Sequence, residues 1–141
     1  MLGRTLRAEE KRVEEYSIKK LTVKDAQTID SLRPDNWSDI SIIHKFYVKN
    51  KACNSIKIVN NRNEIVGIGT GIFFKNTGWL AHIIVSKEYR NQGIGNIIVK
   101  DRINYLQNKK DCNVITLTAT DLGYPLYKKK LVLSMNLYTR Y

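Results

Sequence analysis

The chain has 141 residues, enough for one domain with its own hydrophobic core and too few for a second. Hydrophobic residues make up 43% of it, which is ordinary for a globular protein, and no apolar run approaches the length of a membrane-spanning helix. Lysine and arginine number 24 against 13 acidic residues, a formal net charge of +11, so polyanions have to be considered as partners. The basic residues are spread along the chain, and the one tight run is Lys128–Lys130, which favours compositional bias over a nucleic-acid footprint.

Residues 1–13 are highly charged with few apolar positions, which predicts a flexible lead-in before a single domain over residues 14–141. The N-terminus lacks the apolar segment of a secretory signal, and we therefore expect a cytoplasmic protein. Cys53 and Cys112 stand alone, without C-x-x-C spacing or nearby histidine pairs. This pattern argues against a disulfide framework and against a metal site, and it predicts two ordinary packed thiols.

The first predicted elements are a strand and a short helix. Apolar and polar residues alternate from Tyr16 onward, as they do in a strand with one buried face. Thr22 and Asp25 then have the spacing of a capping box, and apolar residues recur at helical spacing over residues 26–32. A helix in this segment has to stop at Pro34, because the residue before a proline is pushed out of the helical region.

A second helix and an antiparallel meander are predicted next. Ser38 is a good N-cap for the helix. Strands are expected at Ser55–Val59, Ile65–Phe74 and Trp79–Val85, with turn residues between the first two. The alternating glycines at Gly67–Gly71 predict a close backbone crossing or a bulge rather than a nucleotide loop. The predicted apolar side of the second helix consists of Ile42, Ile43, Phe46 and Tyr47.

A third helix and a further strand complete the predicted sheet. The helix runs from Gly95 to about Gln107, and Val114–Thr118 has the composition of a buried strand. Because a whole helix separates this strand from the one at 79–85, the two are expected to be parallel and joined by a right-handed crossover. The predicted fold class is α/β (α+β), a mixed central sheet flanked by helices, with a ligand site beyond the carboxyl ends of the parallel strands. The apolar arc of the third helix consists of Ile98, Val99, Ile103, Tyr105 and Leu106.

The connection Arg90–Gly95 is the most informative stretch of the chain. It follows the apolar run Ile83–Val85 and opens directly into the third helix. Gly93 and Gly95 allow positive φ and close backbone approach, so N–H groups of the loop and first helical turn can converge on an anion at the positive end of the helix dipole. Arg90 adds a fixed charge with a forked set of donors. The loop is therefore predicted to bind phosphate.

Two familiar nucleotide motifs are excluded for this loop. A Walker loop needs a Lys-Ser/Thr pair after its last glycine, where this chain has Asn96 and Ile97, and the dinucleotide fingerprint needs a third glycine where this chain has Ile98. What remains is R-x-x-G-x-G between a strand and a helix. In that setting the loop resembles the acetyl-coenzyme A pyrophosphate loop of the GNAT superfamily of N-acetyltransferases.

A second segment carries the same resemblance. Thr118–Lys129 contains an alanine-bearing strand end followed by Gly-x-Pro-Leu-Tyr, and Gly78–Leu80 precede the apolar positions Ile83 and Val85. Together these motifs are similar to a GNAT subgroup over residues 15 to about 130. The resemblance implies the GNAT fold and transfer of an acetyl group from acetyl-coenzyme A to a primary amine of a small molecule or peptide, by direct attack and without a metal.

The resemblance also implies site residues. Tyr127 matches the tyrosine that protonates the departing thiolate in many relatives, and a tyrosine with an ordinary pKa of about 10 can do so near neutrality. The backbone of Ile83 and Val85 would bind the pantetheine arm like an added half-strand. Thr120 stands where many relatives have an asparagine that touches the cofactor. The residues implied to hold the pyrophosphate, mostly through main-chain N–H groups, are Arg90, Asn91, Gln92, Gly93, Ile94, Gly95 and Asn96.

The general base and the acceptor site stay open. Relatives with a glutamate base carry it about where Trp79 stands, which leaves a water chain or His82 as the base. A lone histidine in a strand can equally be a structural hydrogen-bonding residue. The proline loop ahead of the second helix lies where relatives form the acceptor wall, so Asp35, Asp39 and Trp37 either bind an amine or belong to a solvated loop with one buried tryptophan.

The C-terminal segment departs from the family pattern. Relatives continue into Leu-Gly-Phe after the tyrosine motif, whereas this chain has Lys130–Ser134 and stops at Tyr141. That hairpin usually completes the acceptor pocket, so the main alternative is a catalytically impaired coenzyme A-binding module of the same fold. A nucleic-acid-binding protein is a further alternative that rests on charge alone. We expect no specific nucleic acid and no membrane partner, and the oligomeric state, a homodimer included, stays open.

Overall fold

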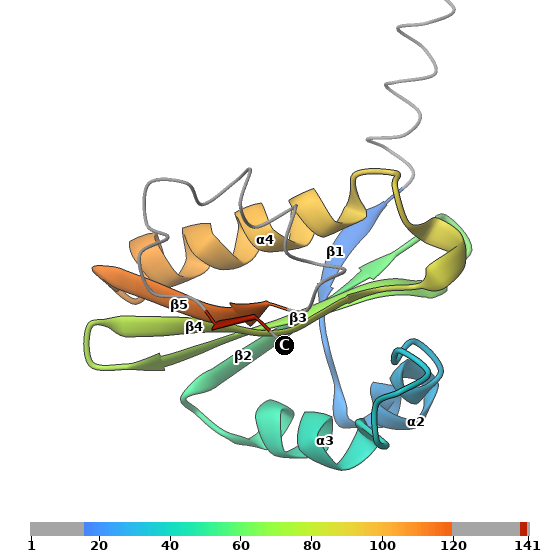
Figure 1. Ribbon diagram of the computed structural model, residues 1–141, viewed down its shortest axis with the longest axis horizontal. Helices are drawn as coiled ribbons and strands as arrows, with labels where there is room; N and C mark the ends of the chain where they lie inside the picture. Colours follow the sequence, from blue (N-terminus) through green and yellow to red (C-terminus); the bar gives the residue numbers. More distant parts are fainter. Residues whose placement is uncertain (1–15, 120–138, 141) are drawn as a thin grey trace, which may run out of the picture.

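A computed structural model describes residues 16–119 and 139–140 (Figure 1). Within these residues, six strands form a sheet in chain order from β1 to β6. The pairs β1–β2, β2–β3 and β3–β4 are antiparallel, whereas the pairs β4–β5 and β5–β6 are parallel. The predicted lead-in at 1–13 lies outside the described residues. The strands are β1 Ser17–Lys20, β2 Cys53–Val59, β3 Ile65–Phe74, β4 Thr77–Val85, β5 Val114–Ala119 and β6 Thr139–Arg140.

Helices cover both faces of the sheet (Figure 1). On one face lie α2 (Ala26–Asp30) and α3 (Ser41–Lys49), and on the other lies α4 (Ile94–Asn104), which continues as a π-helical turn over Tyr105–Lys109. This mixed sheet with helices on both faces confirms the predicted fold class. The core under α2 and α3 contains Leu21, Ile29, Ile40, Ile68 and Ile84, and the core under α4 contains Ile56, Ile58, Val66, Leu80, Ile94, Ile98, Val99, Leu106 and Cys112.

The predicted parallel crossover is confirmed. β4 leads into α4, and β5 then returns alongside β4 in parallel orientation. The paired residues of the two strands are Thr77–Leu80 on β4 and Val114–Leu117 on β5. β4 continues beyond this pairing as far as Val85, so its carboxyl half borders β3 on one side and has no paired strand on the other within the described residues.

The alternating glycines of β3 allow α4 to lie close to the sheet. A Cβ atom on Gly69 would lie 2.3 Å from Cγ2 of Ile98, and one on Gly67 would lie 3.0 Å from Cδ1 of the same side chain. Ile98 is fully buried by this contact. The prediction of a close crossing at these glycines is confirmed, and the β3–β4 register also shifts between Ile68 and Thr70, as expected for a bulge.

The predicted start of the second helix is wrong, and its predicted apolar side is confirmed only in part. α3 begins at Ser41 rather than Ser38, because Asp39 Oδ1 accepts the Ser41 N–H at 2.8 Å and Asp30 Oδ1 accepts the Ile40 N–H at 2.9 Å. Ile42 and Phe46 point outward, with 74% and 53% of their surface exposed, while His44 and Tyr47 are buried. Of the four predicted apolar residues, Tyr47 is buried and Ile43 packs against the core under α2 and α3, and the buried side also includes His44, a polar residue type that hydrophobic periodicity does not mark.

The predicted capping box and the end of the first helix before Pro34 are confirmed. The Thr22 N–H donates to Asp25 Oδ2 at 2.8 Å, as in a capping box, and α2 ends before Pro34. Cys53 and Cys112 are both free, and Cys112 is buried in the core under α4. Over residues 16–119 and 139–140 no helix has the length and apolar character to cross a membrane, and no cluster of acidic, histidine or cysteine side chains could hold a metal ion.

Adding a methyl group at Gly69 should loosen α4 from the sheet. We expect Gly69→Ala to lower the free energy of unfolding by about 1–3 kcal/mol, because the β-branched Ile98 side chain has little rotamer freedom in a helix and cannot move aside. Gly71→Ala in the same strand is the matched control, since its Cβ would lie at an ordinary 3.4 Å from Leu106. Equal urea midpoints for the two variants would contradict this account.

Candidate functional site

Beyond Leu80, the edge of β4 that faces away from β3 has no paired strand in the described part of the chain, and it presents backbone hydrogen-bonding groups. This is called the unpaired edge of β4. The Ser86 N–H donates to Val66 O on β3 at 2.8 Å, and Ile84 pairs with Ile68 two positions earlier, so these residues direct their backbone groups toward β3. Since alternate residues of a strand point their N–H and C=O to opposite sides, Ile83 and Val85 direct theirs to the unpaired edge. These are the two positions predicted to hold a ligand through their main chain.

A β-bulge marks the point where this edge becomes available. Ile68 pairs with Ile84 but Thr70 pairs with Ala81, so β4 contains one more residue than β3 in this interval. His82 lies in the interval and takes a positive φ of 48°. A bulge bends the strand that carries it and interrupts the ladder. Here it falls just beyond Leu80, the last residue of β4 that pairs with β5.

The glycine loop follows directly and has the predicted strand–loop–helix setting. Gly93 is the N-cap of α4 with φ of 85°, and its carbonyl oxygen accepts the first helical hydrogen bond, from the Ile97 N–H at 3.2 Å. The amides of Ile94, Gly95 and Asn96 precede that bond and have no acceptor within the helix. Nothing lies within 4 Å of a Cβ built on Gly93, so the backbone is open to close approach.

Arg90 links the loop to the strand edge. Its Nε donates to Val85 O at 3.3 Å, which confirms that this carbonyl points away from β3 and brings the guanidinium close to the edge. Asn91 takes a left-handed φ of 62°, and Gln92 Oε1 accepts the Tyr16 hydroxyl at 3.1 Å. The structure thus brings the predicted residues 83, 85 and 90–96 to one end of the sheet.

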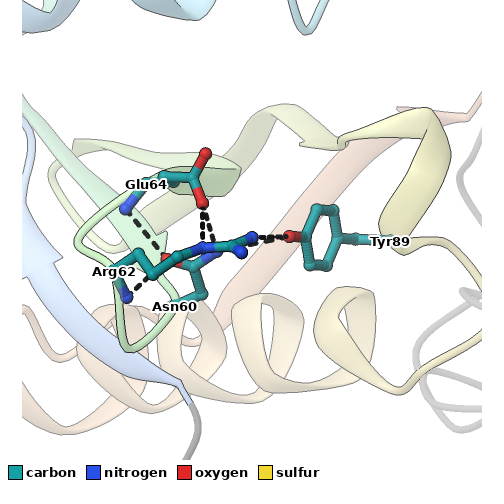
Figure 2. A network of polar contacts seen from close by, with 4 residues as sticks. All are labelled: Asn60, Arg62, Glu64 and Tyr89. Carbon is teal, nitrogen blue, oxygen red and sulfur yellow. Dashed lines mark hydrogen bonds and ion pairs between the residues drawn. The ribbon is translucent and has the colours of Figure 1, made fainter.

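A polar network from the β2–β3 turn holds the start of the loop (Figure 2). Tyr89 Oη accepts hydrogen bonds from Asn60 Nδ2 at 3.3 Å and Arg62 Nη2 at 3.4 Å. Glu64 Oε1 accepts from Asn60 Nδ2 at 3.1 Å and from Arg62 Nε at 2.6 Å, and these two bonds lower the pKa of Glu64. Because Tyr89 immediately precedes Arg90, the network fixes the loop at its first residue. The sequence indicated only a turn here.

Four rings meet on the opposite face, beside the bulge. His82 Nδ1 and Tyr47 Oη are 3.0 Å apart, a hydrogen bond between β4 and α3. His44 contacts both, with ring centroids 5.3 Å from His82 and 5.6 Å from Tyr47, and Trp37 approaches His82 edge-on at 5.7 Å. Both ring nitrogens of His44 are buried without a hydrogen-bond partner in the described part of the chain. The sequence identified His82 and Trp37 as candidates but not His44 or Tyr47.

Burial sets the protonation of this ring cluster, which comprises Trp37, His44, Tyr47 and His82. Burial and, secondarily, the neighbouring His82 lower the pKa of His44 to about 4, and burial also lowers the pKa of His82. Burial, together with Cys53, raises the pKa of Tyr47. At neutral pH both imidazoles are therefore neutral and Tyr47 is a phenol, so His82 is in the state that can accept a proton.

The two candidate acceptor carboxylates are not gathered at the ring cluster. Asp39 caps α3 through the Ser41 N–H, and that hydrogen bond is the main cause that lowers its pKa. Asp35 is exposed in the loop before α3. Of the predicted acceptor-side residues, Trp37 is the one that contacts His82. Tyr127 and Thr120, the remaining predicted site residues, lie outside the described residues.

Comparison with known proteins gives a family and a set of similar folds. A sequence model described as the acetyltransferase (GNAT) family matches residues 16–131. An acetyltransferase from Trypanosoma brucei has a TM-score of 0.68 at 17% identity, covering 90% of this chain and 96% of that one. Glucosamine-6-phosphate N-acetyltransferase from Arabidopsis thaliana has a TM-score of 0.63 at 16% identity, covering 81% and 88%. A mutant of the Vibrio cholerae spermidine N-acetyltransferase has a TM-score of 0.65 at 12% identity, covering 84% and 78%.

The buried imidazoles should make the fold sensitive to acid. Between pH of about 6.5 and about 4, His44 binds a proton in the unfolded chain but not in the folded one. The free energy of unfolding should therefore fall as the pH is lowered through this window, by an amount on the order of 1–3 kcal/mol from His44, with His82 adding to the same trend. His44→Phe should flatten part of this dependence in urea unfolding from pH 8 to pH 4. If the free energy of unfolding of His44→Phe depends on pH as steeply as that of the parent, the lowered pKa of His44 is contradicted.

Proposed function

The chain belongs to the acetyltransferase (GNAT) family, whose acetyl donor is acetyl-coenzyme A, and on that premise we propose that it transfers the acetyl group to a primary amine of a small molecule or peptide. The observation that carries the proposal is the meeting of the unpaired edge of β4 with the free amides at the start of α4. Together they form a strip of backbone donors and acceptors that leads to an anion site, as a pantetheine arm attached to a pyrophosphate requires.

The donor would be held by the residues of this strip. The amides of Ile94, Gly95 and Asn96 and the Arg90 guanidinium would bind the pyrophosphate, with the main chain of Asn91, Gln92 and Gly93 shaping the loop. Ile83 and Val85 would bind the pantetheine arm through their outward backbone groups, and Thr120 would contact it further along. The open space at Gly93 fits a ligand whose phosphates approach the backbone closely.

The transfer itself needs a base for the amine and an acid for the thiolate. Acetyl-coenzyme A supplies a thioester carbonyl that an unprotonated amine can attack. His82 is proposed to take the amine proton, directly or through a water, and its neutral state at physiological pH supports that role. Tyr127 is proposed to donate its proton to the departing sulfur.

The amine acceptor is proposed to approach from the face that carries α2 and α3. Trp37 contacts His82 there, and the net charge of +11 favours anionic rather than strongly cationic ligands around the site. Similar folds act on amines as different as glucosamine-6-phosphate and spermidine, so the identity of the acceptor has to come from a screen. The free thiols Cys53 and Cys112 support the proposal of a cytoplasmic protein.

The loop can be tested by donor binding. Acetyl-coenzyme A should raise the melting temperature of the parent, because a ligand that binds only the native state stabilises it. Gly93→Val should abolish that rise, since a β-branched residue is strained at φ of 85° and blocks backbone approach. Asn91→Gly is the matched control, because glycine tolerates the left-handed φ of 62° and should keep binding. An unchanged isotherm for Gly93→Val would refute the assignment of this loop.

The acid can be tested separately from binding. Tyr127→Phe should keep the affinity for acetyl-coenzyme A but lower kcat by about 10²–10⁴-fold, the range of general acid catalysis, because the hydroxyl acts on charge that develops only as the thiolate leaves. Free thiol release with a panel of amines measures this. Equal kcat across pH would assign Tyr127 a structural role. Tight donor binding without turnover on any amine would favour a coenzyme A-binding module instead.

A further inference from the structure

The hydrogen bond between α3 and the bulge of β4 engages one nitrogen of a candidate base. Tyr47 Oη is 3.0 Å from His82 Nδ1, and Nε2 of His82 has no partner among the described residues. The Tyr47 ring is held firmly, with 8% of its surface exposed and the His44 ring against it at an interplanar angle of 88°. The hydroxyl is therefore presented to His82 from a fixed position.

The pair admits two proton arrangements with different consequences. If Tyr47 donates to Nδ1, then Nε2 carries the ring proton and cannot accept another. If Nδ1–H donates to Tyr47 Oη, then Nε2 has a free lone pair and can accept a proton. Only the second arrangement lets His82 act as a base through its unengaged nitrogen. A phenol that keeps its proton, as the raised pKa of Tyr47 ensures at neutral pH, can serve as the acceptor in it.

The arrangement in which Nδ1–H donates to Tyr47 Oη also stabilises the charge that forms on His82 during acetyl transfer. The lone pair of the unprotonated amine forms the bond to the acetyl carbon, and Nε2 then takes a proton from the positively charged nitrogen, so that the pair of the broken N–H bond returns to nitrogen. The sulfur leaves with the pair of the broken C–S bond and receives the proton that Tyr127 is proposed to donate. The ring then carries a positive charge, and the Nδ1–H to Oη hydrogen bond strengthens. Tyr47 would thus stabilise the state that forms during transfer more than the resting state, which raises kcat rather than affinity.

The hydrogen bond to Tyr47 is the one polar contact of the His82 ring among residues 16–117, because its other neighbours there are aromatic rings. His44 and Tyr47 from α3 and Trp37 from the preceding loop pack around the His82 ring, and Cys53 acts on Tyr47. Among residues 16–117, no charged side chain forms a hydrogen bond or an ion pair with His82. His44 is 1% exposed, so it excludes water from this side of the pair without offering a hydrogen bond of its own.

We infer that Tyr47 is a positioning residue for acetyl transfer, which holds His82 in the tautomer and orientation that present Nε2 to the acceptor amine. This inference rests on the proposed function and on His82 as the base. It assigns α3 a direct part in the reaction, through a residue that touches neither donor nor acceptor.

The test is Tyr47→Phe, which keeps the ring and removes the hydroxyl. We expect kcat to fall about 10-fold to 100-fold, as for loss of a hydrogen bond to a charged group, with the KM for acetyl-coenzyme A unchanged. Removing an acceptor that stabilises the charged imidazole should also move the acid limb of the kcat profile to lower pH. Tyr105→Phe, on the α4 side of the sheet, is the matched control and should change neither quantity.

A double-mutant cycle separates positioning from packing. His82→Gln should remove most of the turnover, and adding Tyr47→Phe to it should cost little more, because the hydroxyl acts through His82. If Tyr47→Phe lowers kcat as much in the His82→Gln background as in the parent, or leaves kcat and the pH profile unchanged in the parent, the inference is wrong.

A measurement without turnover distinguishes this inference from the proposed function. Nitrogen-15 chemical shifts of the His82 imidazole in the parent at pH 7 should show the proton on Nδ1, and Tyr47→Phe should shift the population toward Nε2–H. A parent with the proton on Nε2 overturns the inference, whether or not Tyr47→Phe folds. Absence of acetyl transfer on every amine, with the proton on Nδ1, overturns the proposed function but leaves the Tyr47–His82 arrangement standing.

Discussion

The site depends on the point where β4 leaves the ladder that it shares with β5. Backbone polar groups cannot remain unpaired in a protein interior, so the edge of β4 that has no paired strand within residues 16–119 and 139–140 needs other hydrogen-bond partners, such as water or a ligand. The bulge at His82 produces this state, because it bends β4 just beyond Leu80 while the hydrogen bonds to β3 continue to Val85. Because β4 leaves β5 at this point, Ile83 and Val85 direct backbone groups outward and Arg90 can donate to Val85 O. The loop is accessible for the same reason.

The two faces of the sheet contribute different parts of the site. On one face the glycines of β3 let α4 pack closely, which sets the first turn of α4, with its free amides, beside the edge of β4. On the other face α3 supplies Tyr47 and His44, which bury His82 and lower its pKa. The bulge of β4 affects both faces. It interrupts the pairing at the edge of β4, and it contains His82, whose imidazole contacts Tyr47 on α3. Variants that affect the proposed anion binding should therefore be separable from variants that affect the proposed proton transfer.

The parts of the structure that local patterns determine could be predicted from the sequence. The strand–loop–helix at 83–98, the close crossing at Gly67–Gly71 and the parallel β5 depend on short-range periodicity and on the length of the connection. The Tyr89 network and the Tyr47–His82 hydrogen bond join residues 27 to 35 positions apart, and no local signal marks them. The start of α3 differs from the prediction partly for the same reason, because the Asp30 carboxylate that accepts the Ile40 N–H comes from the end of α2.

Residue-resolved amide hydrogen exchange, with and without acetyl-coenzyme A, tests most directly the claim that the edge of β4 and the first turn of α4 form one ligand site. The account predicts slower exchange at Ile83 and Val85 and at Ile94, Gly95 and Asn96 when the ligand is added, because these amides gain acceptors. Exchange in the β3–β4 turn at 75–76 should stay unchanged. Slowing confined to the loop without the strand, or to other parts of the sheet, would contradict the account.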